Sequence, residues 1–349
     1  MINLKNFENM KEYNRFIPVD DMEYISYIEN TDKVHICNIN EHSNDYLTFI
    51  AKSKGTFVFA GITEMNKISY SLDNGQTWSE PSNNVSITVN KRNKVMWKGE
   101  MTPYTSETGN LVGIGFFDQS SAEFDIRGNI MSLLYDDEYR NVISLTGKDY
   151  AFCGLFANTE VINARNLSLP ATTLSVACYM QLFYNCTKLK VTPVLHAETL
   201  ADSCYKYMFS NCTSLKYAPA LNSVSLAGSC YCNMFDGCAS LEIMPDLPAT
   251  VLQPNAYSNM FSNCISLKTS SVLYASTLVQ DCYKEMFKNC ITLNNITALF
   301  TTEPSDEYTK DWVYNVSETG VFSCSHDAEW DVTGTNGIPA DWIKHIYNI

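Results

Sequence analysis

The chain carries the stretch Cys204-Tyr205-Lys206-Tyr207-Met208-Phe209-Ser210-Asn211-Cys212-Thr213-Ser214-Leu215, and close copies of it recur through the middle of the sequence. The copies place their central Phe at Phe156, Phe183, Phe209, Phe235, Phe261 and Phe287. The last five are spaced by 26 residues, and the first precedes the second by 27. Around each Phe the same residue types return: an aromatic four positions before it, Leu or Met one before, Asn or Gly two after, and Ile or Leu six after. Six such copies indicate a repeat architecture.

Each copy is predicted to hold one short helix and one extended run. Apolar residues at positions −5, −4, −1, 0 and +3 around each Phe follow a helical period, which predicts a helix of about two turns ending near the Asn. The run that follows, such as 215–221, contains Pro219 and is too short for a helix. One helix and one extended run in a unit of ~20–29 residues are typical of leucine-rich repeats. Because extended runs pack closer together than helices, a solenoid of six coils should curve.

The motif aromatic-x-x-Met-Phe-x-Asn-Cys-x-x-Leu, followed by Pro and Leu, resembles the BspA-type leucine-rich repeats over roughly residues 151–300. Proteins of this type are abundant on the surfaces of gut and oral Bacteroidetes and of treponemes, and in phages of such hosts. The resemblance implies a protein that acts on a cell or particle surface. Its bacterial members are usually exported, whereas residues 1–9 lack a basic stretch followed by an apolar run, so no Sec signal peptide is predicted.

Charge divides the 349 residues into three regions. Residues 1–150 carry 14 basic and 21 acidic groups, residues 151–300 carry 8 and 8, and residues 301–349 carry 2 and 9. The overall charge of −14 argues against nucleic-acid binding, because phosphates require a basic surface. No run of eighteen apolar residues occurs, so no membrane insertion is predicted.

Residues 46–149 are predicted to form a small antiparallel β-domain, sandwich-like or jelly-roll-like. Alternating apolar and polar residues between turn signals predict strands at 46–51, 56–60, 67–71, 85–89, 94–97, 124–127 and 130–135. The predicted fold class is therefore α+β. An N-terminal antiparallel β-domain over 46–149 precedes a curved leucine-rich-repeat solenoid of six coils over 150–300.

The two ends of the chain are assigned separately. Residues 1–45 begin with a predicted helix from Leu4 to Phe16, and this arm either packs on the rest of the chain or anchors it in a larger assembly. Residues 301–349 contain Trp312, Trp330 and Trp342 and are predicted to cap the last apolar coil, as a solenoid requires.

The stretch Ser71-Leu72-Asp73-Asn74-Gly75-Gln76-Thr77-Trp78 resembles the sialidase-type Asp-box at every fixed position. In sialidases the box recurs in several propeller blades and does not carry the catalysis. A structural interpretation is favoured, in which Asp73 caps turn amides, Gly75 takes the tight conformation and Trp78 folds back on the hairpin. A sialidase active site would also need an arginine cluster, and the arginines of residues 1–150 are scattered.

The Asn and Cys columns of the repeat are interpreted as structural. Asn side chains can hydrogen-bond the turn backbone of a neighbouring coil, and Cys can serve as a small buried hydrophobe. Disulfides are disfavoured, because eight residues of helix place Cys204 and Cys212 ~12 Å apart and helices in adjacent coils stand too far apart for a bridge. Metal binding is weaker still, since Cys230-Tyr231-Cys232 has no partner pair.

No pattern in the sequence predicts catalysis or a cofactor, because neither metalloprotease, nucleophile-elbow nor P-loop spacing occurs. Binding is the better class. The positions after each framework Leu are predicted to point outward and form a variable surface on a constant scaffold, or else plain solvated surface. This candidate recognition surface consists of Lys190, Thr192, Lys216, Ala218, Glu242, Met244, Lys268 and Ser270, with Asn294 and Ile296 in the same two columns.

The sequence thus favours a non-enzymatic recognition or structural protein. The leading hypothesis is a homo-oligomeric phage virion fibre or appendage that contacts a host-surface protein or glycan through the solenoid and other virion proteins through the arm. The first alternative is a bacterial cell-surface adhesin. The second, which depends on the lone Asp-box, is a carbohydrate-active enzyme or accessory module.

Overall fold

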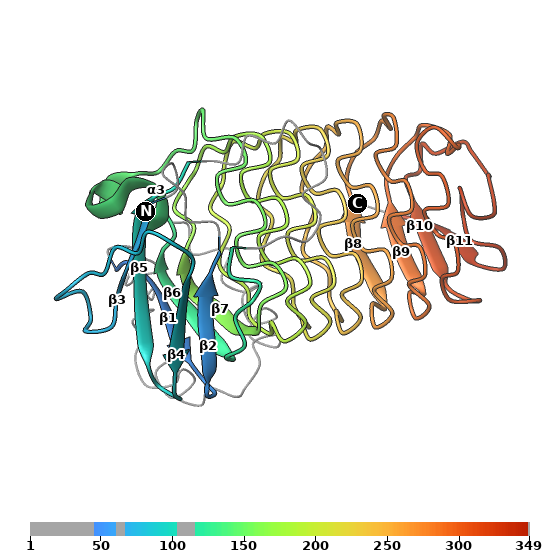
Figure 1. The fold of residues 1–349 in the computed structure, drawn as a ribbon. Coiled ribbons are helices and arrows are strands. Elements are labelled where there is room, and N and C mark those ends of the chain that lie inside the picture. Colours follow the sequence, from blue (N-terminus) through green and yellow to red (C-terminus); the bar gives the residue numbers. More distant parts are fainter. Residues whose placement is uncertain (1–44, 61–66, 103–115, 348–349) are drawn as a thin grey trace, which may run out of the picture. The chain divides into compact units, whose positions relative to one another are not determined.

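The computed structural model describes residues 45–60, 67–102 and 116–347, so the predicted N-terminal arm lies outside the described residues apart from Asp45 (Figure 1). The strands are β1 (Leu47–Ala51), β2 (Gly55–Phe59), β3 (Lys67–Ser71), β4 (Val85–Val89), β5 (Lys94–Glu100), β6 (Phe124–Asn129), β7 (Val161–Ser168), β8 (Thr269–Leu273), β9 (Asn295–Ala298), β10 (Val321–Cys324) and β11 (Ile343–Ile346). Two short helices follow β6: the α-helix α3 (Ser132–Tyr135) and the 3-10 helix η2 (Asp136–Asn141).

The predicted α+β class is wrong, because the described residues hold one four-residue α-helix and are otherwise nearly all-β. That helix, α3, stands where the sequence predicted a strand over 130–135. Side-chain hydrogen bonds turn the chain there: Asn129 Oδ1 accepts from the Met131 amide (2.9 Å), and Ser132 Oγ accepts from the Leu47 amide (3.1 Å).

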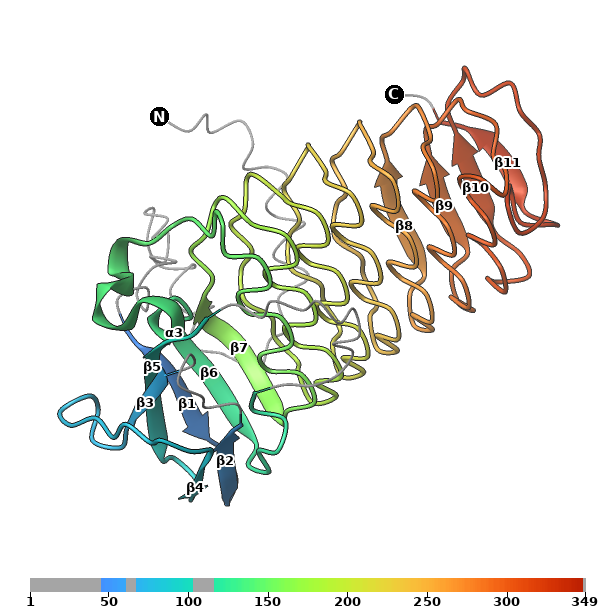
Figure 2. The same cartoon turned by 45° about the horizontal axis from the view of Figure 1, so that its top comes forward.

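The N-terminal part consists of a five-stranded sheet, in the order β3-β5-β1-β6-β7, and a two-stranded sheet, β2-β4. Phe57 of β2 lies 5.4 Å from Phe49 and 5.1 Å from Phe124, ring centre to ring centre, so the two sheets share an aromatic core. All pairs are antiparallel except β6 and β7, which run parallel. Since β7 belongs to the first repeat, the sheet continues across residue 150 into the repeat region (Figure 2).

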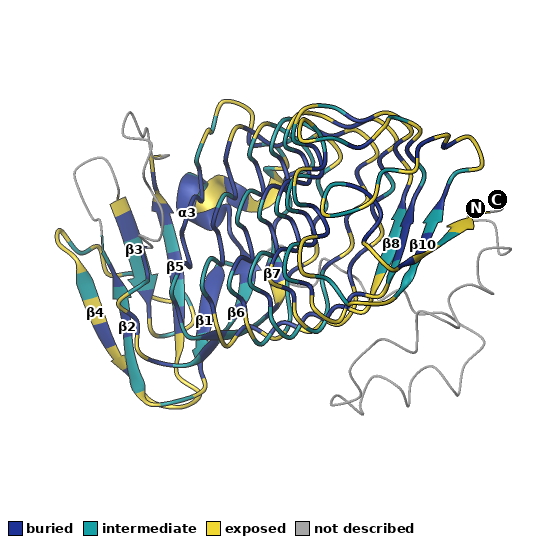
Figure 3. Ribbon diagram, turned by 90° about the vertical axis from the view of Figure 1, so that its right-hand side faces the viewer, coloured by how far each residue is buried: buried dark blue, intermediate teal, exposed yellow. Residues whose placement is uncertain are grey.

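The repeats wind as successive coils, numbered here one to six by the Phe residues from Phe156 to Phe287. Phe209, Phe235 and Phe261 are fully buried and stack with ring centres 5.7 and 5.6 Å apart, within 9° of parallel. The tyrosines four residues earlier form a second buried stack at 5.9–6.0 Å. The prediction that these columns are buried and stacked is confirmed, and buried stretches recur along the ribbon of successive coils (Figure 3).

The predicted helix in each coil does not form. Every fourth residue has a positive φ of 51–75°, as at Ser203, Tyr207 and Asn211 in coil three, and this interrupts a right-handed helix. Amides at alternate positions donate to the next coil instead: Phe209 to the Met234 carbonyl oxygen (2.9 Å), for example. The amides between them close tight turns within the coil. These stretches, termed turn segments, comprise the residues from six before to two after each Phe.

The Asn column ends each turn segment in the left-handed conformation, which Asn tolerates better than most residues. Asn side chains bond to each other rather than to turn backbone: Asn289 Nδ2 donates to Asn263 Oδ1 (2.9 Å), and Asn315 Nδ2 donates to Asn289 Oδ1 (3.1 Å). The sequence predicted that these Asn side chains bond to the turn backbone of a neighbouring coil. The structure shows that they bond to the side-chain amide of the neighbouring Asn instead.

The segment predicted as a cap contains a seventh coil. The coil-to-coil bonds continue, since the Phe287 amide donates to the Trp312 carbonyl oxygen (2.8 Å) and Asn289 to Tyr314 (2.8 Å). The Trp312 ring lies 6.1 Å from both Tyr283 and Phe287, so one indole closes both aromatic columns. Strands β8, β9, β10 and β11 form a parallel sheet beside this coil, with β11 at its edge (Figure 2).

The cysteines that the structure describes are free thiols. Twelve are described, from Cys153 to Cys324, and all are buried. In coils two to six the thiol three residues after the Phe donates to the carbonyl oxygen of the preceding coil's Phe, as Cys238 Sγ does to Phe209 (3.1 Å). The predicted distance between cysteines of adjacent coils was wrong, because coils spaced like strands lie about 4.8 Å apart, within the ~4.4–6.8 Å Cα range of a disulfide. The thiols are instead disfavoured for oxidation by their burial and by their hydrogen bonds to carbonyl oxygens.

These thiols are expected to stay reduced and unreactive in the folded protein. Burial raises the pKa of Cys186 and of Cys290 to about 12, which keeps the nucleophilic thiolate scarce at neutral pH. Iodoacetamide should leave the cysteines from Cys178 to Cys290 unmodified in native protein and label them all in denaturant without reductant. Mass spectrometry reads both states, and two or more bridged peptides among them would contradict the prediction.

Candidate functional site

The predicted recognition surface is only partly exposed. In coils two to six the first column after each framework Leu is exposed, and it consists of Lys190, Lys216, Glu242, Lys268 and Asn294. In the second column Thr192, Ala218 and Ser270 are half-buried, while Met244 and Ile296 are only 6% and 0% exposed. The expectation that Met244 and Ile296 point outward was therefore wrong. Beside Met244 the run makes only an isolated β-bridge at Ile243, so strict alternation of side chains does not persist there, whereas Ile296 lies within the regular strand β9 and its side chain is buried in the core.

The exposed column, termed the strand face, is tied together along the stack. The Glu242 amide donates to the Lys216 carbonyl oxygen (3.1 Å) and the Asn294 amide to Lys268 (3.0 Å). Lys216 Nζ also lies 3.3 Å from Glu242 Oε1, an exposed ion pair between neighbouring coils. The face therefore presents a row of fixed backbone positions whose side chains vary in charge.

A second polar face lies on the turn segments and was missed by the sequence analysis. It is termed the turn face and consists of Lys206 and Tyr207 of coil three, Asn233 and Asp236 of coil four, Ser258, Asn259, Ser262 and Asn263 of coil five, and Lys284, Glu285 and Lys288 of coil six. The helix predicted for these residues assigned them no common outward side. The recurrent Asn at left-handed positions was the signal that could have indicated turns.

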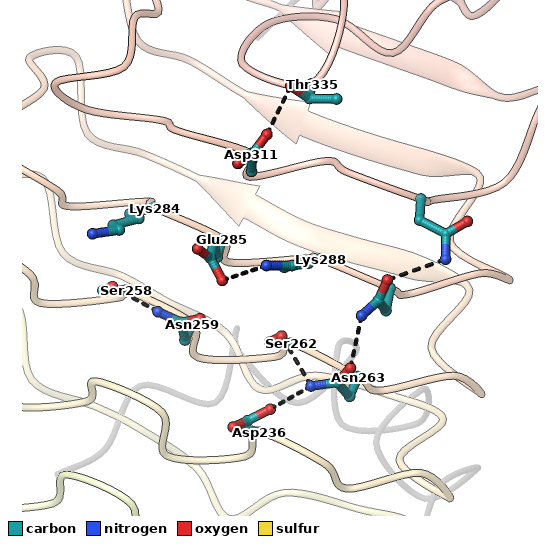
Figure 4. A network of polar contacts seen from close by, with 12 residues as sticks. Asp236, Ser258, Asn259, Ser262, Asn263, Lys284, Glu285, Lys288, Asp311 and Thr335 are labelled. Atoms are coloured by element: carbon teal, nitrogen blue, oxygen red, sulfur yellow. Dashed lines mark hydrogen bonds and ion pairs between the residues drawn. The ribbon is translucent and has the colours of Figure 1, made fainter.

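Asp236 of coil four lies next to Asn263 of coil five on the turn face (Figure 4). Its Oδ1 accepts a hydrogen bond from Asn263 Nδ2 (2.8 Å), and its Oδ2 accepts one from Asn233 Nδ2 (3.3 Å). Burial raises the pKa of Asp236 above its ordinary value, although both amide hydrogen bonds favour the carboxylate. The group is thus a partly desolvated acceptor held in place from two coils.

Larger side chains flank Asp236 on both sides along the stack. Tyr207 packs edge-on against Tyr184 at 6.4 Å between ring centres, and Lys206 Nζ lies 5.7 Å from the Tyr207 ring centre. On the other side Lys288 Nζ lies 2.9 Å from Glu285 Oε2, and the hydrogen bond to that carboxylate raises the pKa of Lys288 above its ordinary value (Figure 4). Lys288 and Glu285 therefore neutralise each other, whereas Lys206 and Asp236 form no ion pair among the described residues.

The Asp-box forms a closed hydrogen-bond network. Asp73 Oδ1 accepts from Ser71 Oγ (2.7 Å) and from the Thr77 amide (2.9 Å), and its Oδ2 accepts from Thr77 Oγ1 (2.6 Å). Trp78 packs edge-on against Tyr46 at 4.9 Å. Both carboxylate oxygens are thus used within the loop, which supports the structural interpretation of the box.

The Asp-box is expected to make stability depend on acid pH. The hydrogen bonds from Thr77 and Ser71 hold the pKa of Asp73 at about 2, below its ordinary 3.8. A depressed folded-state pKa contributes stability above pH ~4 and loses it as pH falls towards 2. The Asp73→Asn variant should therefore melt below wild type at pH 5, with the gap closing by pH 2. Thermal melts across that range test this, and a pH-independent gap would contradict it; Thr77→Val should show the same trend more weakly.

In the part of the chain that the structure describes, no three His, Cys, Asp or Glu side chains gather closely enough to hold a metal ion. Nor does any helix there have the length and apolar character needed to cross a membrane. The chain matches no protein-family model, no curated protein and no solved structure. The turn face and the strand face are therefore the two candidate sites, judged on geometry alone.

Proposed function

We propose that this chain is a non-enzymatic recognition protein, a fibre-like or appendage protein of a phage virion whose strand face contacts a protein or glycan on the host surface. The observation that carries the proposal is the strand face itself. One exposed position recurs in each coil from Lys190 to Asn294, and its side chain changes along the stack while the framework residues beneath stay alike. Repeat proteins use such a surface to read an extended partner.

The BspA-type resemblance supports a place on a virion or cell surface, and homo-oligomerisation is part of the same proposal. The Asp-box does not favour hydrolysis, because both carboxylate oxygens of Asp73 accept hydrogen bonds from donors within the same loop. A hydrolase is therefore not proposed.

A charge-reversal experiment tests the strand face. The triple variant Lys190→Glu, Lys216→Glu and Lys268→Glu should bind intact Bacteroidetes host cells at least about tenfold more weakly than wild type, because interface charges steer and orient association. The matched control reverses three exposed lysines of the β-domain, Lys67, Lys91 and Lys94. Equal binding of both variants would reject the strand face as the contact surface.

Immunogold labelling tests whether the protein is part of a virion or of a bacterial surface. Antibody against residues 150–300 should label virions. Label on bacterial envelopes in phage-free cultures would instead support the surface adhesin.

A further inference from the structure

We propose that the turn face of coils three to six is a second binding site, and that its ligand is an uncharged polysaccharide. The proposal concerns a different surface from the strand face, so either can fail without the other. It follows from four features of the turn face: its hydrogen-bonding groups, its paired charges, its aromatic flank and its repeat.

The middle of the turn face offers amide and carboxylate groups on short side chains. Asn233 and Asn263 both hydrogen-bond Asp236, and Asn263 is exposed. The hydroxyls of Ser258 and Ser262 are buried beneath the amides, and Asn259 Nδ2 donates to Ser258 Oγ (3.0 Å) (Figure 4). Asp236 accepts two hydrogen bonds, and a carboxylate has about four lone-pair sites. Acceptors and donors of this kind suit a ligand rich in hydroxyl groups.

The charges of the turn face favour a neutral ligand over a charged one. Lys288 pairs with Glu285 at 2.9 Å, and Lys284 Nζ lies 3.7 Å from Asp281 Oδ1. Coils one to six are neutral overall, with eight basic and eight acidic groups in residues 151–300. No unbalanced cluster is available for a phosphate, a sulfate or a polycation.

An extended peptide is a poorer fit than a polysaccharide. A peptide that adds to a sheet needs unpaired backbone groups at an edge, yet every amide from Tyr231 to Cys238 already donates to a backbone carbonyl oxygen. Only side chains remain for recognition. The half-buried ring of Tyr207 at one end supplies an amphipathic surface on which a sugar ring can pack.

The repeat of the face matches a repeating ligand. Backbone hydrogen bonds hold neighbouring turn segments at about the 4.8 Å spacing of adjacent strands. Equivalent positions, such as Asn233, Asn259 and Glu285, therefore recur at a constant interval. A polymer of identical units can meet equivalent groups in successive coils, which a single small molecule cannot.

The test uses immobilised dextran, mannan, xylan, arabinan and galactan as neutral probes, with heparin and polysialic acid as acidic ones. Biolayer interferometry with the full chain should detect binding to at least one neutral probe and prefer it to both acidic probes. Tyr207→Ala and Asp236→Asn should each weaken that binding at least about tenfold, the loss typical of one removed charge-assisted or stacking contact. Asp246→Asn and Lys91→Glu, both exposed and outside the turn face and the strand face, should change it less than twofold.

Near-UV circular dichroism and thermal melts of each variant separate lost binding from lost folding, and Tyr184→Ala replaces any variant that does not fold. Failure of all five neutral probes to bind overturns the proposal. So does stronger binding to heparin or polysialic acid, or neutral binding that survives the turn-face variants. Loss of cell binding in the strand-face variant with intact polysaccharide binding would leave this proposal standing and locate the two functions separately.

Discussion

Replacing Phe235 with alanine is expected to lower the free energy of unfolding by about 3–5 kcal/mol, the range for truncating a buried Phe. The ring is fully buried and packs between Phe209 and Phe261 at 5.7 and 5.6 Å. Its loss leaves a cavity in the middle of the column and removes two ring contacts at once. Because each coil packs only on its immediate neighbours, the lost packing cannot be compensated by distant residues.

Guanidinium denaturation followed by circular dichroism measures this effect. Val224→Ala is the matched control, because this side chain is 65% exposed in the same coil region; its truncation should change stability by less than ~0.5 kcal/mol, as for most surface changes. A loss below ~1.5 kcal/mol for Phe235→Ala would mean that the aromatic column is not a packed core.

Gly128→Ala is expected to be about as damaging, with a loss of about 3–5 kcal/mol from backbone strain and steric overlap together. Gly128 has a φ of +87°, and a Cβ placed there would lie 2.1 Å from the Tyr46 carbonyl oxygen. Since that obstacle is backbone, a rotamer change cannot relieve it. The position lies in β6, the strand that joins β1 to the first coil.

Gly147→Ala separates the two causes. Gly147 has a φ of +72°, but its Cβ would meet no atom within 4 Å. This variant should lose only the ~1–2 kcal/mol of a left-handed alanine. Thermal or chemical unfolding of both variants measures the difference, and equal losses would show that the close approach of Tyr46 to Gly128 has no energetic weight.

The period and the buried columns could be predicted from the sequence. A 26-residue recurrence of Tyr, Met, Phe and Leu requires that equivalent residues stack, and the buried rings of Phe209, Phe235 and Phe261 do so. Six strands of the N-terminal part were also predicted within one to three residues, because alternation and turn residues mark them locally. Hydrophobic burial is a property of single residues, so a pattern of residues reveals it.

Hydrogen-bond partners were decided only by the tertiary structure. Apolar residues at −5, −4, −1, 0 and +3 point inward from a helix, but they also point inward from a run of tight turns. The sequence pattern does not show whether the Phe209 amide bonds within its own turn segment or to Met234 of the next coil. The predicted helices do not form because these amides bond to the next coil. For the same reason the sequence did not predict that the residues around Asp236 share one outward face.

The seventh coil and the exposure of the columns after each framework Leu could also be seen only in the tertiary structure. Trp312 fills the space of both a Tyr and a Phe, so the coil persists where its sequence motif does not. Met244 is buried although its position in an ideal strand is outward, because its neighbours make only isolated bridges. The sequence by itself determined which residues form the core and at what interval. The packing of coil against coil determined the backbone conformation between them, because that conformation is stabilised by bonds to the next coil, as from the Phe209 amide to Met234, in addition to bonds between near neighbours.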